Sequence, residues 1–359
     1  MATDPVRLAL VIAGILTILP SRPNAAQLLF LIGIAALLAV SALRSVRLAT
    51  ILALLAGAVV MRVVIMDRVG SDVLDVTSAA IDRVLAGGNP YGIGYAESRP
   101  PGSAFPYGPL ALLWYLPLRS APELMELGAS VAVAIILALQ GRVVGLAVYA
   151  SAPVLVSTAI DGSNDTSLGL LLLAAIMAAA RWPAMGAALL ATAVAFKLSA
   201  LAFVPAFVAW GGMRVAGAFV ATSLIFWAPV VARWGASSFL RSTQLANDVH
   251  GTTAWSIGAI VRDITGVRVD ALDELRFILG GALAAATLAV RRSLDTVILA
   301  GSAVYIVTLH AGNWATFAYF AGLAPLICWR LDDWLGLPSR PLLRRPSRPD
   351  AETQPEPAA

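Results

Sequence analysis

The sequence has a single cysteine, Cys328, and only two histidines among its 359 residues. One cysteine cannot form a disulfide within the chain, and it excludes a cysteine-based metal cluster. The chain is also poor in charge, because 13% of its residues are charged, against about 25% in a typical soluble domain. Since 59% of the residues are hydrophobic, the composition argues against a water-soluble fold and favours a membrane protein.

Several catalytic signatures are absent as well. The sequence contains no P-loop, no dinucleotide-binding fingerprint and no HExxH motif, and it has no G-x-S-x-G nucleophile elbow. ATP-driven pumping and serine hydrolysis are therefore unsupported. A soluble nucleotide-sugar domain is also missing, so an activated sugar would have to arrive on a lipid.

Long apolar segments make up most of the chain. A helix that crosses a bilayer needs about 20 mostly apolar residues. We therefore predict an all-α fold, a polytopic transmembrane helical bundle with about 11–13 spans in the cell (plasma) membrane. The expected spans lie at residues 8–20, 27–43, 48–66, 124–140, 143–160, 166–180, 183–196, 198–210, 214–232, 273–290, 294–309 and 314–330.

The expected spans form one domain, residues 1–337, with its main extracytoplasmic loops at 67–123 and 233–272. An amphipathic interfacial helix is expected in the first of these loops. The tail 338–359 is rich in proline and charge and lacks a core-forming pattern, so we predict that it is disordered and cytoplasmic.

The arginines predict the orientation, because short cytoplasmic loops collect Arg and Lys. With both termini in the cytoplasm, most loop arginines fall on the cytoplasmic side, provided that residues 105–119 lie along the outer surface and do not cross. Side chains capable of chemistry then collect on the outer side. These are Asp72, Asp75, Asp161, Asp165, Lys197, Asn247, Asp248, His250, His310 and Asn313.

The first outer loop opens with two acids, Asp72 and Asp75. Apolar residues recur at helical spacing from Val73 to Val84, which predicts an amphipathic helix on the membrane surface. The pair Gly87-Gly88 is expected to end it. Asp72 stands near the helix start, where the helix dipole favours a carboxylate. It is either a helix cap or a base that accepts a proton.

Two further polar positions interrupt apolar runs. In the turn 161–165, Asp165 fits a cap for the next helix, whereas Asp161 is free to bind sugar hydroxyls or a divalent cation. Two carboxylates are too few to specify a metal site. Lys197 lies within the run 183–210, where an ionisable residue suggests a functional site. We expect it to close a hairpin of two half-length helices and to bind a phosphate or pyrophosphate, with snorkelling to the headgroups as the alternative.

The remaining candidates lie in later outer segments. His250 belongs to a region that mixes amide, acid, histidine and indole side chains. Sugar and phosphate recognition uses this mixture, and interfacial loops have it too. His310 and Asn313 stand at an outer helix end, and we take all three as candidates for substrate binding.

These motifs occur in an order that is similar to the GT-C superfamily of polytopic glycosyltransferases, which use polyprenyl-phosphate sugars. Within it, the chain resembles the bacterial polyprenyl-phosphomannose-dependent mannosyltransferases of actinobacterial cell envelopes. The matching positions are Asp72, Ala79-Ala80, Leu85-Ala86-Gly87, Asn89-Pro90-Tyr91, the segment Phe105 to Leu110 with Tyr107, the turn 161–165, Arg181, the segment 195–205 with Lys197, and Trp255 to Gly258 with Arg262.

The resemblance implies transfer of a sugar, mannose by this likeness, from a polyprenyl-phosphate donor to a lipid or glycan acceptor outside the cytoplasm. Asp72 would be the general base, with Asp75 as the second choice, and Lys197 would meet the charge of the leaving phosphate. The implied substrate-binding residues are Lys197, Asp161, His250, His310, Tyr107 and Asn313. The partners would be the two substrates and membrane lipids, without nucleic acid. No cofactor is specified, and a divalent cation stays open.

Two other classes fit parts of the sequence. A transporter or lipid flippase also uses broken helices and a charged residue within a span. A membrane scaffold without catalytic activity is the third alternative.

Overall fold

The computed structural model describes residues 4–19, 22–65, 71–249, 253, 255–289, 293–338 and 341–342. Within these ranges the chain is all-helical, without any β-strand, and a single bridge pairs Gly94 with Ala104. The predicted all-α class is confirmed for this part of the chain. The predicted disordered tail lies outside it, apart from residues 338, 341 and 342.

The described elements are α1 (Pro5–Ile18), α2 (Ala25–Ser41), α3 (Arg47–Val60), the π-helix η1 (Met61–Ile65), α4 (Val73–Leu85), α5 (Pro109–Tyr115), η2 (Leu116–Leu118), α6 (Glu123–Leu139), α7 (Val143–Ser151), α8 (Pro153–Ser157), α9 (Asp165–Ala179), α10 (Pro183–Phe196), η3 (Leu198–Phe203), α11 (Val204–Trp234), α12 (Ala236–Val249), α13 (Ile257–Thr265), α14 (Ala271–Ala286), η4 (Thr287–Ala289), α15 (Leu294–His310) and α16 (Tyr319–Trp334).

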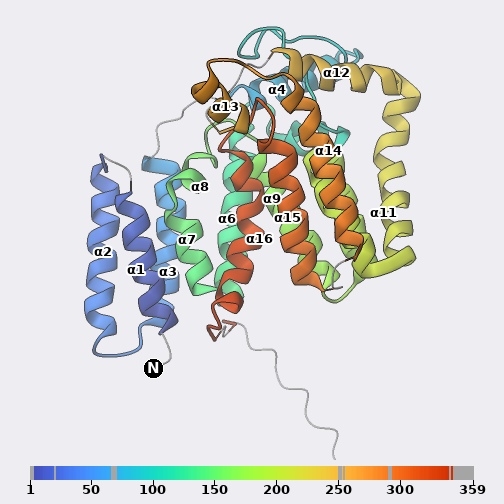
Figure 1. Ribbon diagram of the computed structural model, residues 1–359. Helices are drawn as coiled ribbons and strands as arrows, with labels where there is room; N and C mark the ends of the chain where they lie inside the picture. Colours follow the sequence, from blue (N-terminus) through green and yellow to red (C-terminus); the bar gives the residue numbers. More distant parts are fainter. Residues whose placement is uncertain are drawn as a thin grey trace, which may run out of the picture.

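The long helices lie side by side in a bundle (Figure 1). Helices α1 to α3 form one side and α11 the other, while α9, α15 and α16 lie near the middle. The first described residues and the end of α16 are at one end of the bundle, which we call the terminal end. Helices α4, α12 and α13 cover the opposite end, which we call the α4 end.

Every predicted apolar segment contains a helix, although the one expected at 314–330 begins only at Tyr319. Two described helices are long and apolar enough to cross a membrane, Arg47–Val64 and Leu198–Trp234. Five other apolar helices have 10–17 residues. A helix of 14 residues is about 21 Å long at 1.5 Å per residue, and the hydrocarbon core is about 30 Å thick. The described helices indicate a membrane-associated protein, while their lengths alone do not establish 11–13 spans.

A sharp bend separates the segment 109–118 from α6. The two helical stretches Pro109–Leu118 and Glu123–Leu139 meet at 99°, and they would form a third membrane span only if taken together. Pro117 lies in η2 and Pro122 directly precedes α6, and a proline has no N–H to continue the hydrogen bonds of a helix. The bend is compatible with the surface position expected for 105–119, which stays a prediction.

A buried arginine stabilises the break between α7 and α8. The backbone leaves the helical region at Ala152, and Pro153 has no N–H to donate to the carbonyl of Tyr149. Arg62 supplies the missing donor, since its Nη2 lies 2.7 Å from that carbonyl and 3.2 Å from the carbonyl of Leu155. Only 1% of Arg62 is exposed. Its charge is met by carbonyl dipoles and by the Tyr149 ring, 4.8 Å away.

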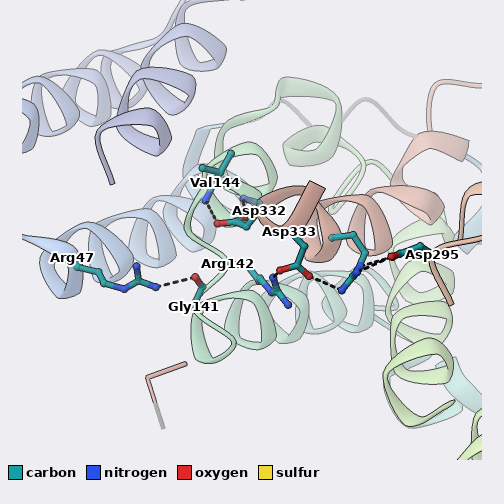
Figure 2. Close-up of polar contacts among 9 residues, drawn as sticks. Arg47, Gly141, Arg142, Val144, Asp295, Asp332 and Asp333 are labelled. Atoms are coloured by element: carbon teal, nitrogen blue, oxygen red, sulfur yellow. Dashed lines mark hydrogen bonds and ion pairs between the residues drawn. The ribbon is translucent and has the colours of Figure 1, made fainter. Parts of the chain in front are cut away.

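Ion pairs join three helices at the terminal end (Figure 2). Arg142, just before α7, pairs with Asp333 of α16, and Arg330 pairs with both Asp333 and Asp295. The buried carboxylate of Asp332 accepts the backbone N–H groups of Val144 and Gly145. Because these amides begin α7, a side chain of α16 caps another helix.

Two glycines allow the backbone of α16 to approach its neighbours closely. A Cβ atom on Gly145 of α7 would overlap the carbonyl oxygen of Cys328, and one on Gly169 of α9 would overlap that of Ala321. Helix α16 is therefore enclosed on two sides at backbone distance.

The Arg62 contact predicts a measurable coupling with Pro153. Arg62→Met should lower the free energy of unfolding by about 1–3 kcal/mol, because it leaves buried carbonyls without a donor. Pro153→Ala restores an N–H that can reach the Tyr149 carbonyl, so the arginine substitution should cost less in that background. Unfolding of the two single variants and the double variant in mixed micelles measures the difference, and additive effects would contradict the explanation.

Candidate functional site

Asp72 lies at the N-cap position of α4, which begins at Val73 as predicted. The helix is present and amphipathic, with Leu74, Val76 and Ile81 buried, while its expected position on a membrane surface stays a prediction. The Asp72 side chain makes no capping hydrogen bond to α4. Its Oδ2 instead accepts the backbone N–H of Arg99 at 2.6 Å. This bond orients the carboxylate across the loop, away from the role of a simple cap.

The turn 158–164 performs the capping by its backbone. The carbonyl of Asp161 accepts the N–H of Ser71, and the carbonyl of Gly162 accepts the N–H of Leu74 at 3.0 Å. These bonds satisfy donors at the start of α4 that have no partner within the helix. They also bring the Asp161 side chain beside the first turn of α4, although about 90 residues separate the two segments in sequence.

Lys197 ends α10 with an extended backbone and is 9% exposed. Its Nζ donates to Asp165 Oδ1 at 2.7 Å and to Asn164 Oδ1 at 2.9 Å. Asp165 is the first residue of α9, but its carboxylate faces the ammonium group. The interpretation of Asp165 as a side-chain cap is therefore wrong. The alternative of snorkelling is also contradicted, because the lysine head is buried in an ion pair.

The expected hairpin around Lys197 is present in modified form. Helix α10 leads into η3 and α11, and α11 runs on to Trp234. Helix α11, the second arm of the hairpin, is interrupted at Gly212, where φ is 69°. The first part of α11 is short, as expected, and the part after Gly212 forms the outer helix on one side of the bundle (Figure 1).

Gly108 brings Tyr107 to Lys197. The N–H of Gly108 donates to the carbonyl of Phe196 at 3.2 Å, and a Cβ at position 108 would overlap the carbonyl oxygen of Ala195. The start of α5 thus contacts the end of α10 directly. As a result the Tyr107 ring lies 5.5 Å from Lys197 Nζ, and the Tyr319 ring lies 5.2 Å away on α16.

The loop between α4 and α5 packs on α11 and α12. Tyr91 contacts the rings of Trp234 and Phe239 edge-on at 5.8 Å and 5.3 Å. The N–H of Gly92 donates to Ser242 Oγ at 2.8 Å. This loop and α12 together cover the α4 end of the bundle.

A cavity of about 480 Å³ lies beneath this cover. Four residues predicted from the sequence line it together: Asp72, Tyr107, Asp161 and Lys197. Their roles stay predictions, but their proximity is a structural fact. The lining also includes Arg99, Asp165, Ser199, Thr243, Trp314 and Tyr319.

The other predicted site residues lie elsewhere. Asp75 pairs with Arg99 at 3.6 Å, with half of its side chain exposed, and it is not part of the cavity lining. The Nδ1 of His310 bonds the carbonyl of Trp255 at 2.9 Å, and its ring stacks on Phe320. His250 lies outside the described residues.

Asn313 is buried and lies outside the cavity lining, where its hydrogen bonds join it to Asp273 and Val269. Its side-chain amide donates to Asp273 Oδ2 at 2.9 Å and to the carbonyl of Val269 at 3.0 Å. Its backbone N–H donates to Asp273 Oδ1. These bonds fix the segment between α15 and α16, which supplies Trp314 to the cavity wall.

Several groups around the cavity were not among the candidates predicted from the sequence. Arg99 and Tyr319 line it, and Asn164 bonds Lys197. Behind the wall, the fully buried Glu126 of α6 accepts from Tyr115 at 2.5 Å and from the Ser167 backbone at 3.0 Å. An acid inside an apolar segment is itself a signal, and Glu126 could have been found by it.

The sequence left open whether Asp161 binds a divalent cation. Among the described residues, no group of three or more His, Cys, Asp or Glu side chains is arranged to hold a metal ion.

The cavity environment changes two protonation equilibria. Burial, aided by Tyr319, Asp165 and Asp72, raises the pKa of Tyr107 well above its ordinary value, so this phenol stays a neutral donor. Burial also raises the pKa of Asp161, although the hydrogen bond from the Ser163 N–H at 2.8 Å opposes this shift. The cavity therefore combines carboxylates, a neutral phenol and one buried cation.

Comparison of the chain with protein-family models, with curated proteins and with solved structures finds no match in any of the three.

Gly108→Ala should destabilise the junction between α5 and α10. The added Cβ overlaps the Ala195 carbonyl, and overpacking of this kind typically costs about 1–3 kcal/mol. Gly128→Ala is the matched control, because no atom lies within 4 Å of a Cβ at that position of α6. Thermal unfolding in detergent compares them, and equal melting temperatures would disprove the close approach.

The raised pKa of Asp161 predicts a pH dependence. The folded protein retains this proton where the unfolded chain has released it, so the contribution of Asp161 to stability falls as the pH rises above the ordinary value of 3.8. Asp161→Asn keeps an oxygen acceptor for Ser163 and removes the titration. The stability of the variant relative to the native protein should increase as the pH rises above 3.8. Asp263→Asn, at a side chain 74% exposed, is the control, and a constant difference for Asp161→Asn would refute the shift.

Proposed function

We propose that this chain is a polytopic membrane glycosyltransferase. It moves a sugar, mannose by the resemblance described above, from a polyprenyl-phosphate donor to a lipid or glycan acceptor at the non-cytoplasmic face. The observation that carries the proposal is the presence of Asp72 and Lys197 in the lining of one cavity. A base for the acceptor hydroxyl and a cation for the leaving phosphate are two groups that would accelerate glycosyl transfer.

Asp72 is suited to act as the base. Its Oδ2 is fixed by the Arg99 N–H, while no described residue forms a hydrogen bond with Oδ1. The acceptor hydroxyl transfers its proton to this carboxylate as its oxygen attacks the anomeric carbon with inversion. Such general-base assistance contributes about 10²–10⁴-fold to the rate.

Lys197 is suited to receive the leaving group. The bond between the anomeric carbon and the phosphate oxygen breaks, and its electron pair remains on the polyprenyl phosphate. Lys197 has three N–H donors, of which Asp165 and Asn164 occupy two. The third can donate to a phosphate oxygen, and a charge already fixed in place needs no reorganisation during the reaction. Tyr107 and Asp161 lie beside the reacting groups and can bind sugar hydroxyls.

The bundle supports a multi-pass orientation with cytoplasmic termini. Arg142 pairs with Asp333 near the end of α16 (Figure 2), and Arg330 belongs to the same end of that helix. The end of α16 lies at the terminal end of the bundle (Figure 1), and the positive-inside rule favours arginines at the cytoplasmic face. The cavity residues belong to segments at the α4 end. Helices shorter than a bilayer are tolerated where the membrane thins around them or flanking residues snorkel, so the short apolar helices are compatible with crossing.

Asp72→Asn should reduce transfer by at least about 10²-fold with folding unchanged, because it removes the base and keeps the side-chain shape. The assay follows labelled mannose from polyprenyl-phosphomannose into extractable lipid or glycan in proteoliposomes. Asp82→Asn is the control on the same helix, where the side chain is 66% exposed and pairs with Arg119. Asp75→Asn tests the second choice of base and should have a much smaller effect than Asp72→Asn. Full activity of Asp72→Asn would end the assignment.

Helix breaks favour a second candidate, a transporter or lipid flippase. Helices are interrupted before Pro153, after Lys197 and at Gly212. Discontinuous helices of this kind commonly form transport sites. The same proteoliposomes distinguish the two functions. Counterflow of a labelled solute or lipid without sugar transfer would support transport, whereas transfer without counterflow supports the enzyme.

A further inference from the structure

Among the described residues of the cavity lining, the one buried cation, Lys197, is already paired with a carboxylate. The Asp165 carboxylate lies 2.7 Å from Lys197 Nζ, and the side chains are 3% and 11% exposed. A simple phosphate-binding lysine would need no counter-ion so close to its ligand. Asp165 also lines the cavity, so it faces the space that the ligand of Lys197 would occupy.

The geometry of an ammonium group fixes how near the two anions must be. Its N–H bonds point to the corners of a tetrahedron, and each hydrogen bond is about 2.8 Å long. A phosphate oxygen on the remaining N–H of Lys197 would therefore lie roughly 4.5 Å from the bonded oxygen of Asp165. Because the pair is buried, solvent screens this repulsion poorly.

Glycosyl transfer changes the charge of the phosphate. The polyprenyl-phosphate sugar is a phosphodiester with one negative charge. When the anomeric C–O bond breaks, the electron pair stays on the phosphate, which becomes a monoester with about −1.5 to −2 charges at pH 7. The acceptor proton moves to the carboxylate base and not to the phosphate, so the product carries more charge than the donor at the same position.

We infer that Asp165 is a specificity-determining residue that limits the charge the phosphate position accepts, so that it retains the phosphodiester donor and releases the phosphomonoester product. This inference rests on the proposed function, because it assumes that Lys197 binds the phosphate. Asp165 repels the product more strongly than the donor, which favours departure after each transfer. The same residue disfavours pyrophosphate-linked donors.

Two prenyl phosphates of different charge test the inference. The probes are farnesyl methyl phosphate, a monoanionic diester, and farnesyl phosphate, a monoester that is mainly dianionic at about pH 8. Binding to the full chain in nanodiscs is measured by calorimetry. The native protein should bind the diester at least about tenfold more tightly than the monoester. Equal affinities, or a preference for the monoester, would overturn the inference without any variant.

Asp165→Asn should raise the affinity for the monoester at least about tenfold and that for the diester much less, so that the preference disappears. Asp263→Asn removes one negative charge from an exposed position and should leave both affinities unchanged. Asp165→Glu keeps the charge and should keep the preference, which provides a second variant if the amide variant does not fold. An equal change in both affinities for Asp165→Asn would make the ion pair purely structural and refute the inference.

Lys197→Gln distinguishes the phosphate role of Lys197 from the charge-limiting role of Asp165. It should weaken both probes at least about tenfold. If both probes bind the native protein and the glutamine variant equally well, the phosphate role of Lys197 fails, and the inference about Asp165 fails with it. If Lys197→Gln abolishes binding but Asp165→Asn leaves the diester preference intact, only the inference fails and the proposed function stands.

Discussion

A buried ammonium group requires a counter-charge, and in this chain the pair of Lys197 with Asp165 organises the surrounding structure. Desolvation of two charges is expensive, and the pair is tolerated only with good geometry and further hydrogen bonds. The 2.7 Å contact and the Asn164 amide provide these. Removal of either partner would leave an uncompensated charge in the wall of the cavity, so α9 and α10 must meet where they do.

Backbone N–H and carbonyl groups also need hydrogen-bond partners where the backbone departs from a regular helix. Arg62 donates to carbonyls at the break before Pro153, the turn 158–164 accepts the first amides of α4, and Asp332 caps α7 from α16. In an apolar environment an unsatisfied backbone group is costly. These three sets of hydrogen bonds between distant segments accordingly lie at helix ends and breaks.

The sequence predicted the helices and part of the site, for identifiable reasons. Apolar runs and polar interruptions are local, so α4 and the position of Lys197 could be found from them. The Asp165 partner could not, because 32 residues separate it from Lys197 and helix-cap statistics favoured the local role. Arg62 and Glu126 each interrupt an apolar run and could have been found by that signal, but the partners of Arg62 at Tyr149 and Leu155 and that of Glu126 at Ser167 are distant in sequence and could not. For His310 the helix end was the expected one, but side-chain direction changes by about 100° per residue on a helix, and the neighbouring Leu309 lines the cavity instead. Asn313 lies in the connection between α15 and α16, where no helical period predicts side-chain direction, and its neighbour Trp314 lines the cavity.

The close packing around α16 determines which wall of the cavity is able to move. Gly145 and Gly169 bring two neighbouring helices to its backbone, and Asp332 and Asp333 attach its far end to α7 and Arg142. Axial sliding or tilting of α16 would break these contacts together, so Tyr319 forms a fixed wall. The opposite wall includes α12, whose buried side chains, among those that the structure describes, are Phe239 and Ser242. On the proposed function, a lipid-linked substrate would therefore enter and leave by displacement of α12, while α16 stays in place.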